Sequence, residues 1–240
     1  LAGASPNTLS GDVTFISGGG VVANKGTIST GNITIHGIDD TLVNTATNSL
    51  GDAAIVSFTG AFTPTLDLAV AATDTIGGLS SLSGIGSVAL RTGSTLTLNT
   101  TTDQSYSGDF FDDGTVVKTG TGNQTFTGTC DASLGAPSFS VNAGTLIVNS
   151  TTFGSCPFAV SGGKLKGSAT LGNVSLTGGT IAPGNSPGTM NVASLTLNSS
   201  STFEEEIAGA TAGSGYDQLI ATGAVSLGNA TLSVLPTYTP

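Results

Sequence analysis

The sequence predicts an all-β protein, a single-stranded right-handed parallel β-helix (β-solenoid) of elongated shape. Apolar and hydroxyl residues alternate with a period of two in many short segments, and no long segment has the 3.6-residue period of an amphipathic helix. Similar segments also recur along the chain. A coil of about 20 residues that carries two or three short strands is one turn of such a solenoid.

Each short segment follows a glycine or an asparagine, or lies close to one, and carries Leu, Ile or Val at every second position. Because successive side chains of a strand point to opposite faces, each segment has one buried and one solvated face. The segments are 93–98, 144–148, 163–166, 174–176, 195–197, 225–227 and 230–234.

Equivalent leucines of these segments are separated by roughly ten or twenty residues. We interpret the longer steps as complete turns and the shorter steps as successive strands of one turn. At about 4.8 Å per turn, roughly ten turns would form a rod about 50 Å long. The leucines are Leu146, Leu165, Leu176, Leu197 and Leu219.

We expect one solenoid domain over residues 1–240, because no Pro-rich linker divides the chain. Residues 1–107 fit the repeat less well than 108–240, and 41–57 is interpreted as a long loop or an irregular turn. The alternative fold is an antiparallel β-sandwich pair. That fold requires two-residue hairpin turns, for which Asp113-Gly114 is the best candidate.

Only 8% of the residues are charged and 38% are hydrophobic, so the chain can bury a core and lacks the composition of a disordered protein. The formal net charge is −10, without the clustered Lys and Arg that bind nucleic acids. No stretch approaches the roughly 20 apolar residues of a membrane span. We therefore expect no nucleic-acid partner and no membrane span. The basic residues are Lys25, Arg91, Lys118, Lys164 and Lys166.

The two cysteines, Cys130 and Cys156, lie 26 positions apart. A zinc site needs about four closely spaced ligands, and no histidine is near this pair. Their separation is close to one turn plus a short insertion, so stacked turns would bring the two positions together. We expect a disulfide rather than two free thiols, which would suit an oxidising compartment. No cofactor and no metal-ligand set is expected.

Residues 108–150 contain three elements in order: an apolar-Lys-x-Gly-x-Gly segment, a Thr-rich strand with a Thr-Gly turn, and a closing Ala-Gly-Thr-Leu strand. The residues are Val117, Lys118, Gly120 and Gly122, then Thr125, Phe126, Thr127 and Gly128, then Ala143, Gly144, Thr145 and Leu146. This pattern resembles the autotransporter-associated β-strand repeat of bacterial autotransporter passengers. Residues 179–188, 201–204 and 216–219 resemble the segment that commonly follows such repeats.

The resemblance implies a bacterial protein of the extracellular space or cell surface, and it carries little information on activity. We therefore expect a non-enzymatic structural or surface protein: a rod, stalk, adhesin or filament subunit. Neither a helix nor charged residues are evident as a cap, and the alternating segment 230–235 is uncharged. The expected partner is therefore a second copy of the chain, joined through the solenoid ends. Cell-surface glycans are a further candidate partner.

The alternative function is that of a β-helix carbohydrate-active enzyme, a polysaccharide lyase or glycosidase. Such an enzyme needs two carboxylates several ångströms apart and usually aromatic platforms for sugar rings. Asp112 and Asp113 precede Gly114 and are interpreted as turn residues, as are Asp39 and Asp40. The chain has no Trp and only three Tyr. Convergence of acidic residues from different turns in one groove would favour the enzyme.

Three further features have interpretations that need no ligand. Calcium could use Asp112 and Asp113, but no Asp-x-Asp-x-Asp loop or Gly-Gly-x-Gly-x-Asp repeat occurs. His36 falls on the polar face of its strand and is expected in solvent. Lys164 and Lys166 are expected to form a small basic patch on an outer face.

Glu205 departs from the pattern of its strand, because alternation places it on the same face as Phe203 and Ile207. An isolated buried carboxylate would have a raised pKa. We therefore expect the strand to bulge here, or to keep Glu205 near solvent or near a lysine.

Overall fold

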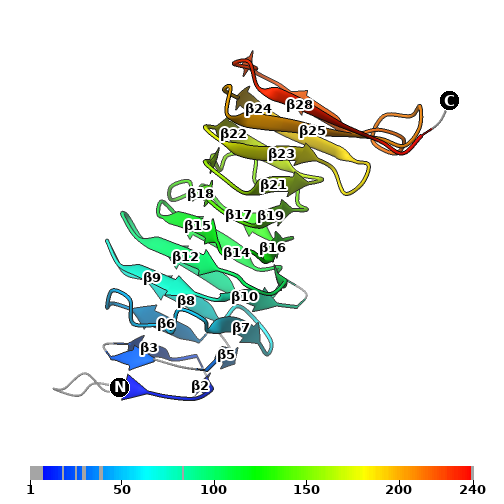
Figure 1. Ribbon diagram of the computed structural model, residues 1–240. Helices are drawn as coiled ribbons and strands as arrows, with labels where there is room; N and C mark the ends of the chain where they lie inside the picture. Colours follow the sequence, from blue (N-terminus) through cyan, green and yellow to red (C-terminus); the bar gives the residue numbers. More distant parts are fainter. Residues whose placement is uncertain are drawn as a thin grey trace.

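The computed structural model describes residues 8–17, 19–24, 26–28, 31–37, 40–82 and 84–238. These residues contain no helix and form a parallel β-solenoid of about eight turns (Figure 1). The predicted solenoid is confirmed, with somewhat fewer turns than expected. The alternative antiparallel β-sandwich is wrong, because every pairing between named strands in this part of the chain is parallel.

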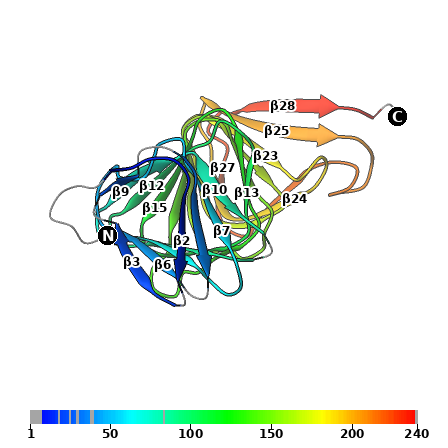
Figure 2. The ribbon, with the colours of Figure 1, turned by 90° about the horizontal axis from the view of Figure 1, so that it is seen from below.

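The strands form three faces around a common interior, as Figure 2 shows in a view from the N-terminal end. Face 1 contains β2 (Val13–Ser17), β5 (Ile33–Gly37), β7 (Ile55–Thr59), β10 (Gly78–Ser81), β13 (Gln104–Tyr106), β16 (Asn123–Phe126), β19 (Thr145–Val148), β21 (Lys164–Gly167), β23 (Gly179–Pro183), β25 (Ser201–Ile207) and β28 (Thr231–Pro236). Face 2 contains β3 (Val21–Asn24), β6 (Thr41–Asn44), β8 (Thr65–Leu68), β11 (Ser87–Leu90), β14 (Asp109–Asp112) and β17 (Thr129–Cys130). Face 3 contains β1 (Thr8–Leu9), β4 (Thr27–Ile28), β9 (Thr73–Ile76), β12 (Thr95–Asn99), β15 (Thr115–Thr119), β18 (Ser138–Val141), β20 (Phe158–Val160), β22 (Thr170–Leu176), β24 (Thr189–Thr196), β26 (Gln218–Ala221) and β27 (Val225–Ser226).

Inward and outward residues alternate in most strands, as the sequence predicts. In β12, Leu96 and Leu98 are buried, whereas Thr95 and Thr97 point outward. Aromatic rings fill the middle of the interior, with neighbouring ring centroids 4.8 to 6.4 Å apart and mostly inclined to one another. The rings are those of Phe58, Tyr106, Phe110, Phe126, Phe139, Phe153 and Phe158.

The leucine spacing identifies turns correctly except at its last step. Leu146 of β19 lies in register with Leu165 of β21, which makes a complete turn, and Leu176 lies on the next strand, β22. Leu219, however, pairs with Met190. The step from Leu197 to Leu219 is therefore not a turn, because the loop before β26 changes the spacing.

Residues 41–57 are more regular than expected. They contain all of β6 and the start of β7, and only 45–54 lie between strands. Even this segment continues the ladder of face 3, because Ile28 N donates to Ser49 O and Asn48 N donates to Thr73 O. The expectation of a long loop is wrong, whereas the alternative of an irregular turn fits, because this face-3 segment has ladder hydrogen bonds but forms no strand.

Face 1 passes from one sheet to the next between β10 and β13, and the side chain of Gln124 bridges this break. Gln124 lies on β16 and is fully buried. Its Oε1 accepts a hydrogen bond from Leu79 N at 3.1 Å, and its Nε2 donates to Leu79 O at 3.0 Å. The amide therefore satisfies both backbone groups of a residue on β10, as a neighbouring strand would.

The six-stranded sheet of face 2 ends at β17, and the turn between β20 and β22 is shorter than the earlier turns. The paired residues Phe158 and Val174 are 16 positions apart, whereas Thr73 and Thr95 are 22 apart. In the turn after β17 this side is a connecting segment, tied to the following turn by the isolated bridge between Phe153 and Leu171. Strand pairing resumes there with the first residues of β22, since Leu171 pairs with Val192 of β24, and Val192 pairs with Ala221 of β26.

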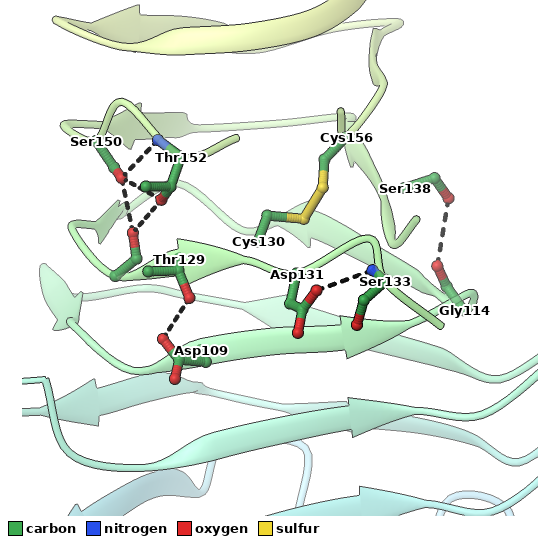
Figure 3. Close-up of a disulfide and its surroundings, with 11 residues drawn as sticks. Asp109, Gly114, Thr129, Cys130, Asp131, Ser133, Ser138, Ser150, Thr152 and Cys156 are labelled. Atoms are coloured by element: carbon green, nitrogen blue, oxygen red, sulfur yellow. Dashed lines mark hydrogen bonds between the residues drawn. A yellow bond between two sulfur atoms is a disulfide. The ribbon is translucent and has the colours of Figure 1, made fainter. Parts of the chain in front are cut away.

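The predicted disulfide between Cys130 and Cys156 is confirmed, and it lies where face 2 loses its ladder (Figure 3). Cys130 belongs to β17, and Cys156 precedes β20 in the following turn. The two Cα atoms are 6.6 Å apart, within the range that a disulfide can span. Both cysteines are buried. The covalent bond thus joins neighbouring turns, as expected.

Replacing both Cys130 and Cys156 by Ala should lower the free energy of unfolding by on the order of 3 to 4 kcal/mol, because the bond restricts the unfolded chain. Urea unfolding of the wild type and the double variant measures this change. Reductant should destabilise only the wild type. Alkylation of both cysteines in the native protein without reductant would contradict the disulfide.

Replacing Gln124 by Leu should cost about 2 to 5 kcal/mol, because two buried backbone groups of Leu79 lose their partners. Gln104 provides a matched control on the neighbouring strand, since its side chain donates only to the hydroxyl of Thr102. Gln104→Leu should cost far less. Equal losses in urea unfolding would show that the bridge is unimportant.

Candidate functional site

Acidic residues from different turns do converge at one place, around Arg91. Its Nε and Nη2 donate to the two carboxylate oxygens of Asp67 at 3.1 and 2.8 Å, and its Nη1 lies 3.1 Å from Asp112 Oδ2. Asp67 lies on β8 and Asp112 on β14, on either side of the turn that carries Arg91. The bond to Asp67 and the attraction of both carboxylates raise the pKa of Arg91. One guanidinium therefore binds both carboxylates.

The adjacent acidic residue lies apart from this ion-pair cluster. Asp113 is exposed and accepts a hydrogen bond from the Thr92 hydroxyl at 3.2 Å. Asp112 has a φ of 70°, which is characteristic of a residue that ends a strand in a turn. The turn interpretation fits both residues, whereas no pattern in the sequence predicts the ion pair across turns.

The remaining residues singled out near the N-terminus are placed as follows. Asp40 is buried, and its Oδ1 accepts from Gly19 N and Gly20 N, so it ties a turn to the preceding one. Asp39 and Lys25 lie outside the described residues. His36 is exposed, as predicted, and its Nδ1 lies 2.9 Å from the Thr59 hydroxyl of the next turn.

Lys164 and Lys166 share the outer side of face 1, as predicted, but they do not form an isolated basic patch. Lys164 Nζ lies 2.8 Å from Glu204 Oε1. Glu205 is half-buried, and burial together with the nearby Asp217 raises its pKa. The strand thus keeps Glu205 partly in solvent, while the lysine contacts the preceding residue instead.

Lys118 is a buried polar residue that the sequence analysis does not single out, since it appears there only among the basic residues and in the repeat pattern. Its side chain is only 1% exposed and belongs to an inward column between Leu98 and Val141. Nζ donates to the carbonyls of Thr119, Gly120 and Ala143. Burial lowers the pKa of Lys118 to about 8. Its burial could have been predicted from its position two residues after Val116, because alternate residues of a strand point to the same side.

A second buried polar cluster lies near the N-terminal end. The side chains of Asn24, Asn44 and Ser49 are hydrogen-bonded to one another. Asp74 Oδ2 accepts from Asn44 Nδ2 at 2.8 Å and from Ser49 N at 2.9 Å. Burial raises the pKa of Asp74, and these hydrogen bonds oppose the shift. The cluster holds the segment between β6 and β7 against β9.

A shallow hollow of about 430 Å³ lies on the outer side of face 3. We call it the face-3 groove. It runs across β15, β18, β20, β22 and β24, and its lining carries no ionisable side chain. Outward residues of the lining are Ser138, Ser140, Ala159, Asn173, Ser175 and Thr196.

In the described part of the chain, no group of three or more His, Cys, Asp or Glu side chains is arranged to hold a metal ion. None of these residues forms a helix that is long and apolar enough to cross a membrane.

No protein family, curated protein or solved structure matches this chain in comparisons with known proteins. The resemblance of residues 108–150 to the autotransporter-associated repeat therefore stays a prediction. The fold and the placement of individual side chains carry the functional argument.

The contribution of Lys118 to stability should rise with pH between about 8 and 10.4, the ordinary pKa of lysine. The folded-state pKa is the lower one, so the unfolded chain binds more protons in this window. The free energy of unfolding of the wild type should therefore rise, relative to that of Lys118→Met, by up to about 1 kcal/mol per pH unit. Urea unfolding between pH 7.5 and about 9.5 tests this window.

Lys166→Met is the matched control, because Lys166 is half-exposed on an outer face. Its stability difference from the wild type should stay constant over the same pH range. A constant difference for Lys118→Met as well would show that burial does not shift the pKa of Lys118.

Proposed function

We propose that this chain is a non-enzymatic structural protein of the extracellular space or bacterial cell surface. It would act as a rod, stalk, adhesin or filament subunit. The observation that carries the proposal is the continuous stack of strands from β2 to β28, which gives an elongated solenoid with a packed interior (Figure 1).

Two further observations support this proposal. The carboxylates of Asp67 and Asp112, which converge from different turns, are both occupied by Arg91 and do not face each other across an open cleft. The disulfide between Cys130 and Cys156 is compatible with an oxidising, extracytoplasmic compartment.

We also propose that the solenoid assembles head to tail. At the C-terminal end, β28 is the edge strand of face 1 in the described chain, and it leaves Leu232 63% and Val234 43% exposed. Leu232 lies in register with Phe203, so it continues an inward column that nothing described covers. Beside it, Leu197, Phe203 and Leu227 line an apolar hollow.

The opposite end presents a matching edge. There β2 is the outermost described strand of its parallel sheet, and its inward residues Val13 and Phe15, which pair with the buried Ile33 and Ile35, are only partly buried. A second copy that added its β2 to β28 would continue both the parallel ladder and the apolar interior. Unpaired strand edges favour such addition, and a repeated head-to-tail contact gives an open filament.

Purified protein should therefore form rods longer than one chain in electron micrographs and should sediment as concentration-dependent oligomers. The variant Leu232→Lys/Val234→Lys places charges at the edge and should remain monomeric. Thr95→Lys/Thr97→Lys adds the same charges in the middle of face 3 and should still assemble. A wild type that stays monomeric at high concentration would refute head-to-tail assembly.

A further inference from the structure

The face-3 groove exists because small side chains interrupt the outer surface of face 3. Ala159 lies in register between Ser140 and Ser175, and Ser175 is paired in turn with Thr196. The methyl group of Ala159 thus forms the floor, and hydroxyl groups of the neighbouring turns form the sides. The strand that carries it, β20, has only three residues.

The groove offers hydrogen-bonding groups without charge. Thr115 and Ser138 hydroxyls are 2.9 Å apart, and the Ser194 hydroxyl donates to Asn173 Oδ1 at 2.7 Å. The hydroxyls of Ser175 and Thr196 have no hydrogen-bond partner among the described residues, and neither has the side-chain NH₂ group of Asn173. Donors and acceptors are therefore both available to a ligand.

These groups repeat along the axis of the solenoid at the spacing of stacked strands. From β15 to β24 the groove crosses five strands, which corresponds to about 19 Å. A ligand that fills the groove lengthwise must be extended and must present hydroxyl groups at short, regular intervals. A linear polysaccharide has this chemistry, since successive sugar residues repeat at a similar length.

We propose that the face-3 groove binds a linear, uncharged polysaccharide, which extends the proposed surface function by naming the partner that this face would contact. Acidic glycans fit poorly, because no cation lines the groove and the chain has a net charge of −10. The lining mixes hydroxyl and amide groups with the apolar surface of Pro157 and Ala159, which suits a ligand that presents both hydroxyl groups and C–H faces, as a sugar ring does. No exposed aromatic ring lines the groove, so binding depends on many weak contacts, with a dissociation constant of about 1 mM.

The test is titration of the isotopically labelled 240-residue variant Leu232→Lys/Val234→Lys, which should remain monomeric, with hexasaccharides, followed by amide resonances in NMR spectra. The neutral probes are linear hexamers of β-1,4-glucose, α-1,4-glucose, mannose and N-acetylglucosamine, and a heparin hexamer is the acidic comparison. At least one neutral hexamer, at up to about 10 mM, should shift resonances of residues 138–140, 159, 173–175 and 194–196. The heparin hexamer should not.

Ala159→Arg places a long charged side chain in the floor of the groove and should weaken binding by roughly tenfold or more. Thr97→Arg adds the same side chain on face 3 outside the groove and should leave binding unchanged. The inference is wrong if no neutral hexamer binds, if the shifts lie elsewhere, if heparin binds in the groove, or if both variants bind equally. Sedimentation of the wild type reports on assembly separately, so a negative result for the groove leaves the proposed rod function intact.

Discussion

Parallel, in-register stacking of turns is the constraint on which the rest of this structure depends. A strand inside the stack pairs with the turn before it and the turn after it, so side chains fall into columns that point either inward or outward. One inward column runs through Leu66, Val88, Phe110 and Cys130, which are successive partners in face 2. Each turn buries its apolar residues only because its neighbours do the same, and stability accumulates turn by turn.

Where this ladder is interrupted, individual side chains replace it. Gln124 satisfies the backbone of Leu79 at the break in face 1. The Nζ of Lys118 donates to three carbonyl groups at a corner between faces 3 and 1. The backbone changes direction there, so these carbonyls have no strand partner. The disulfide between Cys130 and Cys156 joins two turns where the ladder of face 2 is interrupted. These polar and covalent contacts lie in or beside the core, because buried backbone groups are costly when left unpaired.

The sequence predicts what depends on local alternation and fails where contacts cross turns. The segments 93–98 and 144–148 correspond closely to β12 and β19, because apolar residues at every second position decide which side is buried. The disulfide was predictable, since one turn sets the distance between its cysteines. The ion pair of Arg91 with Asp67 and Asp112 was not, because the variable loop lengths decide which residues of distant segments become neighbours. The face-3 groove was not predictable for the same reason, because it depends on which residues of neighbouring turns lie in register.

The distribution of charge distinguishes face 3 from the other two. Face 1 carries Lys164, Lys166 and three consecutive glutamates of β25, and face 2 carries the ion pairs of Arg91. In the described strands of face 3 the only charged residues are Asp74 and Lys118, and both are buried. The outer side of this face is therefore uncharged over most of the solenoid, although the chain is strongly acidic. Water or a neutral ligand can contact it without displacing counterions, whereas a charged partner gains nothing there.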